Sequence, residues 1–269
     1  MDRPSAPRSV VVIGAGQAGL AVAYYLRRLG LESGRDLVIL DRGPLPGGAW
    51  QFRWEALRLG SAHRVHDLPG MDRMGLSFAT ADRRRPARDV VTEYYGDYER
   101  AWDLPVRRPE AVRSVTSAMP GDRSSALVIE TDRAVEHARI VVNATGTWGS
   151  PFVPYYPGRD RFKGVQLDTT EYVRAEDFAG KQVVVVGGGT SAIGFLLELE
   201  RVARSVTWAT RRPVEFRDGE QLAFESAVEA VAEQDRAARA GRALPSIVGG
   251  TGVQRTRRVV AGIERGVLR

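Results

Sequence analysis

Short β-branched runs, each followed by a cluster of glycines, dominate the hydrophobic pattern of the chain. The first run covers residues 9–13, and a second run of the same kind covers residues 181–186. Continuous apolarity over such a length is typical of strands that are buried on both faces of a parallel sheet. The pattern therefore predicts an α/β fold with two Rossmann-like dinucleotide-binding domains.

The elements around the first run follow the order of a βαβ unit. Residues 20–26 place apolar side chains on one face of a helix that we expect to end near Gly30, and residues 36–40 form a second apolar strand that ends at Asp41. Between the first strand and the helix lies the sequence Gly-Ala-Gly-Gln-Ala-Gly. A strand, a glycine-rich turn, a helix and a strand ending in an acid together predict a dinucleotide site.

Each glycine of this turn has a physical role at a pyrophosphate. Gly14 permits the tight turn, Gly16 lets the backbone approach the phosphates, and Gly19 lets helix and strand pack closely. The helix N-terminus offers unpaired N–H groups to the phosphates, and Asp41 is expected to accept hydrogen bonds from the ribose. The residues predicted to bind the first cofactor here are Gly14, Gly16, Gln17, Ala18, Gly19, Asp41 and Arg42.

The second run begins another unit of this kind. It leads into three glycines, with an alanine in the third small position, and we expect a helix over residues 193–202 and a strand over 205–209. This strand is followed by arginines, which attract a 2′-phosphate, so the prediction is NADPH. The alternative is a pair of solvated arginines without a ligand. The predicted residues are Gly187, Gly189, Thr190, Ser191, Ala192, Arg211 and Arg212.

Composition limits the chemistry further. The chain has 269 residues, no cysteine and three histidines. Disulfides, cysteine-ligated metals, thiol nucleophiles and flavoenzymes that use a redox-active cysteine pair are excluded, and a histidine-rich metal site is not expected. The length suits one large or two small domains.

Charge and hydropathy indicate neither a nucleic-acid binder nor a membrane protein. The net charge is +6, but 39 basic residues are scattered among 33 acidic ones instead of forming a stripe. No apolar run approaches the roughly 18 residues of a membrane span, and the first apolar run is too short for a signal peptide. We therefore expect a cytoplasmic protein with no nucleic-acid or membrane partner.

The chain resembles the flavin-containing monooxygenases over about residues 10–217. The first glycine turn resembles their FAD site, and the second, with its arginines, resembles their NADPH site. Four further segments resemble parts of these enzymes that contact the cofactors. They are a Gly-Gly-x-Trp segment, a Leu-Arg-Leu-Gly-Ser segment, a short strand whose backbone is expected to contact adenine, and an Ala-Thr-Gly turn. The residues assigned by this resemblance are Gly48, Ala49, Trp50, Arg58, Ser61, Val106, Ala144, Thr145 and Gly146.

The resemblance implies a two-cofactor oxidoreductase. NADPH would reduce FAD, and the reduced flavin would use oxygen to oxygenate nitrogen, sulfur or a carbonyl carbon of a small molecule. Residues 1–150 would form the FAD-binding domain, and residues 151–269 an NADPH-binding domain that is incomplete at its C-terminus. Two alternatives remain open: a truncated flavoprotein that binds cofactors without turnover, and an NADPH oxidase without coupled oxygenation.

Two departures from the family motivate these alternatives. Within the family's Phe-x-Gly-x-x-x-His-x-x-x-Tyr sequence, Asp168 occupies the histidine position, where it either repels cofactor phosphates or simply faces solvent. The chain also has a single Ala-Thr-Gly turn, so each domain is expected to lack late strands. Sheets without their last strands expose edges and apolar faces, which favours either association, such as a homo-oligomer, or instability.

Three further segments have helical or loop patterns. Residues 90–102 are expected to form a helix whose aromatic stripe packs in the core. Residues 223–240 and 255–268 are expected to be helical as well, and Gly249 and Gly250 to lie in a loop.

Overall fold

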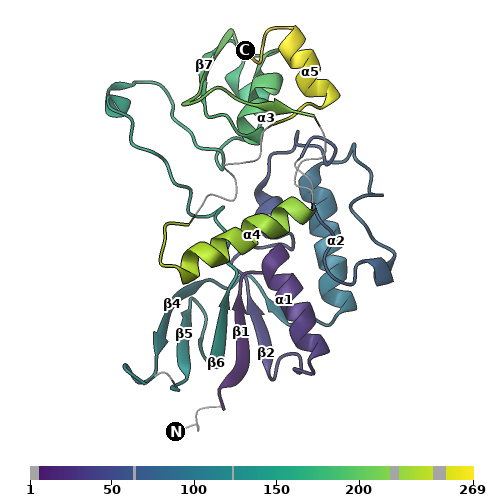
Figure 1. Cartoon of the computed structure of the whole chain (residues 1–269), viewed down its shortest axis with the longest axis vertical. Coiled ribbons are helices and arrows are strands. Elements are labelled where there is room, and N and C mark those ends of the chain that lie inside the picture. The colour runs from purple at the N-terminus through teal and green to yellow at the C-terminus, as the bar shows by residue number, and fades with distance from the viewer. Residues whose placement is uncertain (1–5, 63–64, 123, 219–223, 245–252) are drawn as a thin grey trace. The chain divides into compact units, whose positions relative to one another are not determined.

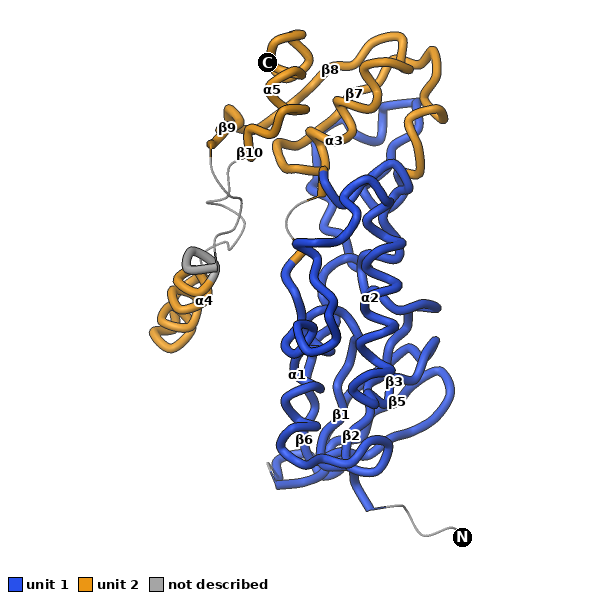
Figure 2. Tube along the Cα trace, turned by 90° about the vertical axis from the view of Figure 1, so that its right-hand side faces the viewer, with its two compact units in different colours: residues 1–60, 66–172 blue, residues 61–65, 173–269 orange. Residues whose placement is uncertain are grey.

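The computed structural model describes residues 6–62, 65–122, 124–218, 224–244 and 253–269. The chain divides into two compact units, which Figure 2 shows in different colours. Unit 1 contains residues 1–60 and 66–172, and unit 2 contains residues 61–65 and 173–269. Residues 151–172, which the sequence analysis placed with the second domain, therefore group with unit 1.

Unit 1 is built on a six-stranded sheet with the strand order β3-β2-β1-β6-β5-β4. The first four strands in this order run parallel, and β5 and β4 continue the sheet in antiparallel fashion. The strands are β1 (Arg8–Ile13), β2 (Leu37–Leu40), β3 (Val106–Arg107), β4 (Val112–Ser117), β5 (Leu127–Thr131) and β6 (Val135–Asn143). The two strands predicted for the first βαβ unit, over residues 9–13 and 36–40, are confirmed as β1 and β2.

The described residues of unit 1 contain two α-helices, and both were predicted. Helix α1 (Gln17–Arg28) contacts β1 and β2 (Figure 1), and helix α2 (Ala87–Ala101) contains the aromatic stripe. Tyr95 and Tyr98 are fully buried, which confirms that the stripe is core. Short 3-10 turns complete the unit: η1 (Gly48–Phe52), η2 (Asp72–Met74) and η3 (Arg159–Arg161).

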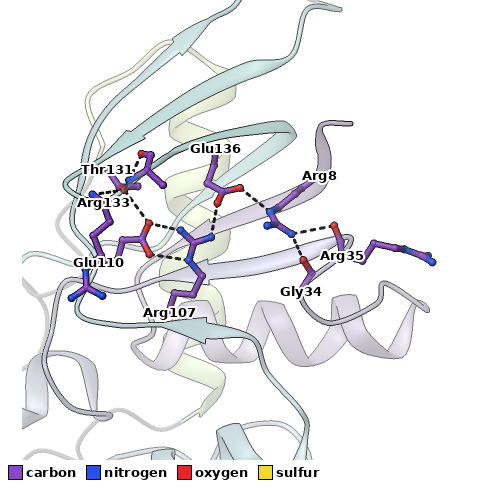
Figure 3. Close-up of polar contacts among 9 residues, drawn as sticks. Arg8, Gly34, Arg35, Arg107, Glu110, Thr131, Arg133 and Glu136 are labelled. Carbon is purple, nitrogen blue, oxygen red and sulfur yellow. Dashed lines mark hydrogen bonds and ion pairs between the residues drawn. The ribbon is translucent and has the colours of Figure 1, made fainter. Parts of the chain in front are cut away.

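A network of arginines and glutamates connects several strands of unit 1. Figure 3 shows the Arg107 guanidinium between the carboxylates of Glu110 and Glu136. Arg107 Nε donates to Glu110 Oε2 at 2.8 Å, and Arg8 Nε donates to Glu136 Oε2 at 2.9 Å. Glu110 is buried, and it also accepts from Thr131 Oγ1 at 2.9 Å. These bonds join β1, β3, β5 and β6.

Unit 2 contains the second predicted βαβ unit. Strand β7 (Gln182–Val186) pairs in parallel with β8 (Ser205–Ala209), and helix α3 (Thr190–Leu199) connects them, which confirms the prediction. The remaining elements are η4 (Ala175–Phe178), β9 (Phe216–Arg217), α4 (Phe224–Arg239), β10 (Val253–Gln254) and α5 (Arg257–Glu264). Both predicted tail helices are present, and Gly249 and Gly250 lie outside the described residues.

The sheets of unit 2 are small. Within the described residues, β7 pairs only with β8, and β9 pairs only with β10. Val184 and Val186 on β7 are 60% and 58% exposed, although their apolar run is typical of a buried strand.

Candidate functional site

The turn between β1 and α1 is shaped for close backbone approach. Gly14 has φ +104°, and a β-carbon there would lie 2.4 Å from the Ala144 carbonyl oxygen. A β-carbon on Gly19 would lie 1.9 Å from the Gly14 oxygen, so the helix packs directly on the turn. Gly16 caps α1 without a side-chain hydrogen bond, and no acid lies in the first turn. The N–H groups and the positive end of the helix are therefore available to an anion.

Asp41 braces this turn from the end of β2. Its carboxylate is buried, accepting from Ala15 N at 2.8 Å and from Gly43 N at 2.6 Å. A carboxylate has about four acceptor positions, so two remain for a ribose. The role of Asp41 toward the ribose stays a prediction, and the structure adds a role in holding the two loops.

The Gly-Gly-x-Trp segment lies against the first glycine turn. A β-carbon on Gly48, which has φ +53°, would come within 2.7 Å of the Gly16 Cα. Gln51 Nε2 donates to the carbonyls of Leu45 and Gly48 at 2.8 and 3.0 Å, which fixes the loop. Trp50 is buried, so this aromatic is largely part of the core.

The Ala-Thr-Gly turn forms a third side of the same site. Ala144 N donates to the Ile13 carbonyl at 2.9 Å, and Thr145 Oγ1 donates to Asn143 Oδ1 at 2.8 Å. Further along this loop, a β-carbon on Gly149 would overlap the Arg42 guanidinium, 1.1 Å from its Nη2. The missing side chain thus leaves room for Arg42, which is itself exposed.

Unit 1 thus brings together most of the residues predicted to bind FAD. Val106 pairs with Ile39 beside Asp41, whose N–H donates to the Arg107 carbonyl at 3.0 Å. Arg58 is exposed and forms a bridge with Pro86, whereas Ser61 groups with unit 2. The predicted residues that lie around the turn are Gly14, Gly16, Gln17, Ala18, Gly19, Asp41, Arg42, Gly48, Ala49, Trp50, Ala144, Thr145 and Gly146.

The second glycine turn has a similar local construction in unit 2. Gly187 N donates to the Ala209 carbonyl at 2.9 Å, and Trp208 Nε1 donates to the Gly187 carbonyl at 2.8 Å. Gly189 caps α3 without a side-chain hydrogen bond, and no acid lies in its first turn. Arg211 and Arg212 are exposed and form no ion pair with a described residue. The turn and the arginines are therefore open to a ligand.

Asp168 is tied into a local turn. Its Oδ1 accepts from Thr170 N at 2.7 Å and from Thr170 Oγ1, and its own N–H donates to Glu171 Oε2 at 2.8 Å. Tyr172, which closes the family sequence, is buried with its ring edge-on to Trp54 at 5.9 Å. The carboxylate therefore has a structural function in this loop.

Sequence reasoning missed Arg53. Its guanidinium carbon lies 3.9 Å from the ring centre of Trp148 and 5.5 Å from that of Trp50. Burial lowers the pKa of Arg53 to about 10. No local pattern signals this contact, because Arg53 and Trp148 come from distant loops.

Metal and membrane features are not found in the described part of the chain. Its residues contain no group of three or more His, Asp or Glu side chains that could hold a metal ion. None of its helices combines the length and apolar character needed to cross a bilayer.

Comparison with known proteins identifies the family of the chain. The sequence profile of the pyridine nucleotide-disulphide oxidoreductase family matches residues 11–235. The chain is 33% identical to indole-3-pyruvate monooxygenase YUCCA6 of Arabidopsis thaliana over 70% of this chain and 44% of that protein. The structure of a flavin monooxygenase mutant from Stenotrophomonas maltophilia aligns with a TM-score of 0.75 and 33% identity, covering 98% of this chain and 69% of that one.

A more distant structure shares the fold. OTEMO, solved in complex with FAD and NADP, aligns with a TM-score of 0.60 at 20% identity over 81% of this chain and 41% of its own. The chain spans about half the length of the curated relatives it matches. The described sheets and the family profile confirm the expected two-unit α/β fold, and the chain belongs to the flavin monooxygenases of the pyridine nucleotide-disulphide oxidoreductase family.

Proposed function

We propose that this chain carries the FAD and NADPH sites of a monooxygenase that oxygenates a small molecule. The observation that carries the proposal is a pair of close backbone contacts, Gly14 with Ala144 and Gly48 with Gly16, beside an uncapped helix N-terminus. Side chains at these glycines would fill the space, so the turn is kept narrow and its N–H groups accessible. These features fit the pyrophosphate of FAD.

The protein residues bind and orient, and the cofactors supply the redox chemistry. FAD, when bound, accepts a hydride from NADPH and delivers electrons to oxygen. The α1 N-terminus would hold the diphosphate, and Asp41 would retain acceptor positions for the ribose. The second turn, with Arg211 and Arg212, would hold NADPH through its phosphates.

The two glycine turns suggest that each part of the chain binds one of the two cofactors. Residues 1–150 would bind FAD and residues 151–269 NADPH, with residues 151–172 as the connection. A nitrogen, sulfur or carbonyl centre of a small molecule would be the acceptor of oxygen. We further propose a cytoplasmic location and association into a homo-oligomer.

One observation favours a second function, that of an NADPH oxidase. Asp168 replaces the histidine of the family sequence and is bound to its own turn. If this change prevents coupling, NADPH, oxygen and a proton yield NADP⁺ and hydrogen peroxide, and no substrate is oxygenated.

Anaerobic titration of the FAD-loaded protein with NADPH tests the proposal. Stoichiometric bleaching of the flavin absorbance is expected. Bound FAD that NADPH does not bleach identifies a passive cofactor-binding protein, and failure to bind FAD overturns the proposal. After oxygen is admitted, peroxide formed in a 1:1 ratio to NADPH identifies the oxidase, and a lower ratio in the presence of substrate identifies the monooxygenase.

A further inference from the structure

Arg53 is a cation in an unusual setting. It follows η1, where its N–H donates to the Trp50 carbonyl at 3.0 Å, and its guanidinium lies over the indole rings of Trp50 and Trp148. The separation of 3.9 Å from the Trp148 ring centre is van der Waals contact. Such contacts attract the cation and exclude water from its faces. They leave the in-plane N–H donors of the guanidinium without a partner, because a ring face is not a conventional acceptor.

No described residue supplies that partner. Arg53 Nε is buried without an acceptor, and neither Nη group forms a hydrogen bond or ion pair with the described part of the chain. The chain has 33 acidic residues, and the other half-buried arginines among the described residues pair with carboxylates, as Arg107 does. Arg108 also has a buried Nε without an acceptor, but both of its Nη groups donate to Glu99. A charged donor that is partly desolvated and unpaired lowers stability, so its retention calls for an explanation.

The position of Arg53 suggests what it binds. Both of its ring contacts come from the loops that enclose the first glycine turn: Trp50 from the Gly-Gly-x-Trp segment and Trp148 from the loop after β6. The guanidinium is therefore held at the rim of the proposed FAD site. An arginine whose planar faces are covered presents its edge as a fork, which matches the two oxygens of a carboxylate or phosphate.

We propose that Arg53 is an oxyanion-binding residue at this rim, with its stacked guanidinium fork receiving a carboxylate or phosphate group. The oxyanion has two possible sources, the carboxylate of an acidic substrate and a phosphate of the cofactor. The inference rests on the proposed function only for the nature of these sources. The unpaired fork is itself a feature of unit 1.

Calorimetric titration with three probes tests the inference: sodium benzoate, inorganic pyrophosphate and FAD. The proteins compared are the wild type, Arg53→Ala, Arg53→Lys and the matched control Arg73→Ala. This control removes an exposed arginine of the same unit that forms no ion pair with any described residue. Arg53→Ala is expected to weaken at least one probe by at least about tenfold, the loss of a charge-assisted hydrogen bond. The affinity of Arg53→Lys for the probes should lie between those of the wild type and Arg53→Ala, because lysine keeps the charge but lacks the planar pair of donors. Arg73→Ala should bind the probes as the wild type does.

The probes distinguish the two sources. Loss of benzoate binding by the FAD-loaded protein, with FAD affinity unchanged, assigns the site to a substrate carboxylate. Weaker FAD and pyrophosphate binding, with no benzoate binding to the FAD-loaded wild type, assigns it to a cofactor phosphate. If Arg53→Ala does not fold, the probe affinities of Arg53→Lys and Arg73→Ala are compared instead, and weaker binding by Arg53→Lys alone supports the inference.

Two results would overturn the inference. One is binding of all three probes by the Arg53 variants within twofold of the wild type, even if their melting temperatures fall, because a purely packing role would lower stability alone. The other is a wild type that binds none of the probes. Failure of the wild type to bind FAD, with the other two probes still bound through Arg53, would overturn the proposed function and leave this inference standing.

Discussion

The backbone of Gly48 lies against the backbone of Gly16, so that a β-carbon on Gly48 would approach the Gly16 Cα to 2.7 Å. The first glycine turn and the Gly-Gly-x-Trp turn are separated in the sequence, but their backbones pack directly against each other. The contact explains why both carry glycine where they meet. It also makes the shape of the phosphate turn dependent on the second loop.

We expect Gly48→Ala to weaken FAD binding by more than about tenfold. The substitution places a side chain at φ +53° and forces the two loops apart, which moves the N–H groups at the start of α1. Gly75→Ala is the matched control, since Gly75 has φ +68° but nothing within 4 Å of its β-carbon position. Both variants should lose about 1–2 kcal/mol from the left-handed backbone.

Quenching of FAD fluorescence measures the difference between the two variants. Only Gly48→Ala should show weakened binding and a stability loss beyond that of the control. Equal effects of the two substitutions would show that the Gly16 contact is not important.

Asp41→Asn should destabilise unit 1 by about 1–3 kcal/mol. Both carboxylate oxygens accept from backbone N–H groups, and an amide would place its own donors against one of them. Urea unfolding measures the loss, and Asp72→Asn, an exposed change on η2, is the control. A free energy of unfolding equal to that of the control would contradict a bracing role for Asp41.

The stability of unit 1 should depend on Glu136 in acid. Burial raises the pKa of Glu136, but hydrogen bonds from Arg107 and Arg8 outweigh burial and lower the pKa below its ordinary value of 4.5. A carboxyl whose pKa is lower in the folded state stabilises the fold fully above its unfolded pKa. That contribution is lost as the pH falls through the folded pKa, below 4.5.

Unfolding curves between pH 3 and pH 7 check this dependence. Glu136→Gln should destabilise the protein most at neutral pH, and its curve should approach that of the wild type in acid. Glu130→Gln, an exposed change on the adjacent strand β5, should leave the pH dependence unchanged. A constant gap between Glu136→Gln and the wild type across the range would show that ionisation of Glu136 is not the cause.

The sequence predicted those elements whose signals are local. In both units a strand, a glycine turn and a helix follow one another directly in the sequence. Gly14 therefore indicates the turn between β1 and α1, and Gly187 the turn between β7 and α3. Strands β4 and β5 were missed because β4 is only half-buried and its register shifts between Val112 and Ser114, which blurs the alternation. Strands β9 and β10 are two residues long and give no pattern.

Features that depend on distant contacts could not be predicted. The contact of Arg53 with Trp148 requires the loop after β6 to lie next to η1. The sequence near either residue contains no pattern that predicts this contact. The ion pairs of the half-buried Arg107 depend on the order of the strands in the sheet, and the sequence predicted that order only in part.

The preference for NADPH should depend on the arginines after β8. Arg211→Ala and Arg212→Ala are each expected to weaken NADPH binding by about 10- to 100-fold, the loss of a charge-assisted hydrogen bond to the 2′-phosphate. Affinity for NADH, which lacks this phosphate, should change less than about threefold. Arg204→Ala is the matched control, because Arg204 is an exposed arginine at the opposite end of β8 and its side chain forms no ion pair with a described residue.

Anaerobic bleaching of bound flavin by each nucleotide gives both affinities in one experiment. The change should be specific for NADPH, because an exposed arginine acts on the 2′-phosphate through charge and hydrogen bonds. A damaged turn at Gly187 would instead weaken the binding of both nucleotides. Parallel losses for NADPH and NADH would therefore locate the defect in the glycine turn. Unchanged affinity for both would identify the two arginines as solvated surface residues.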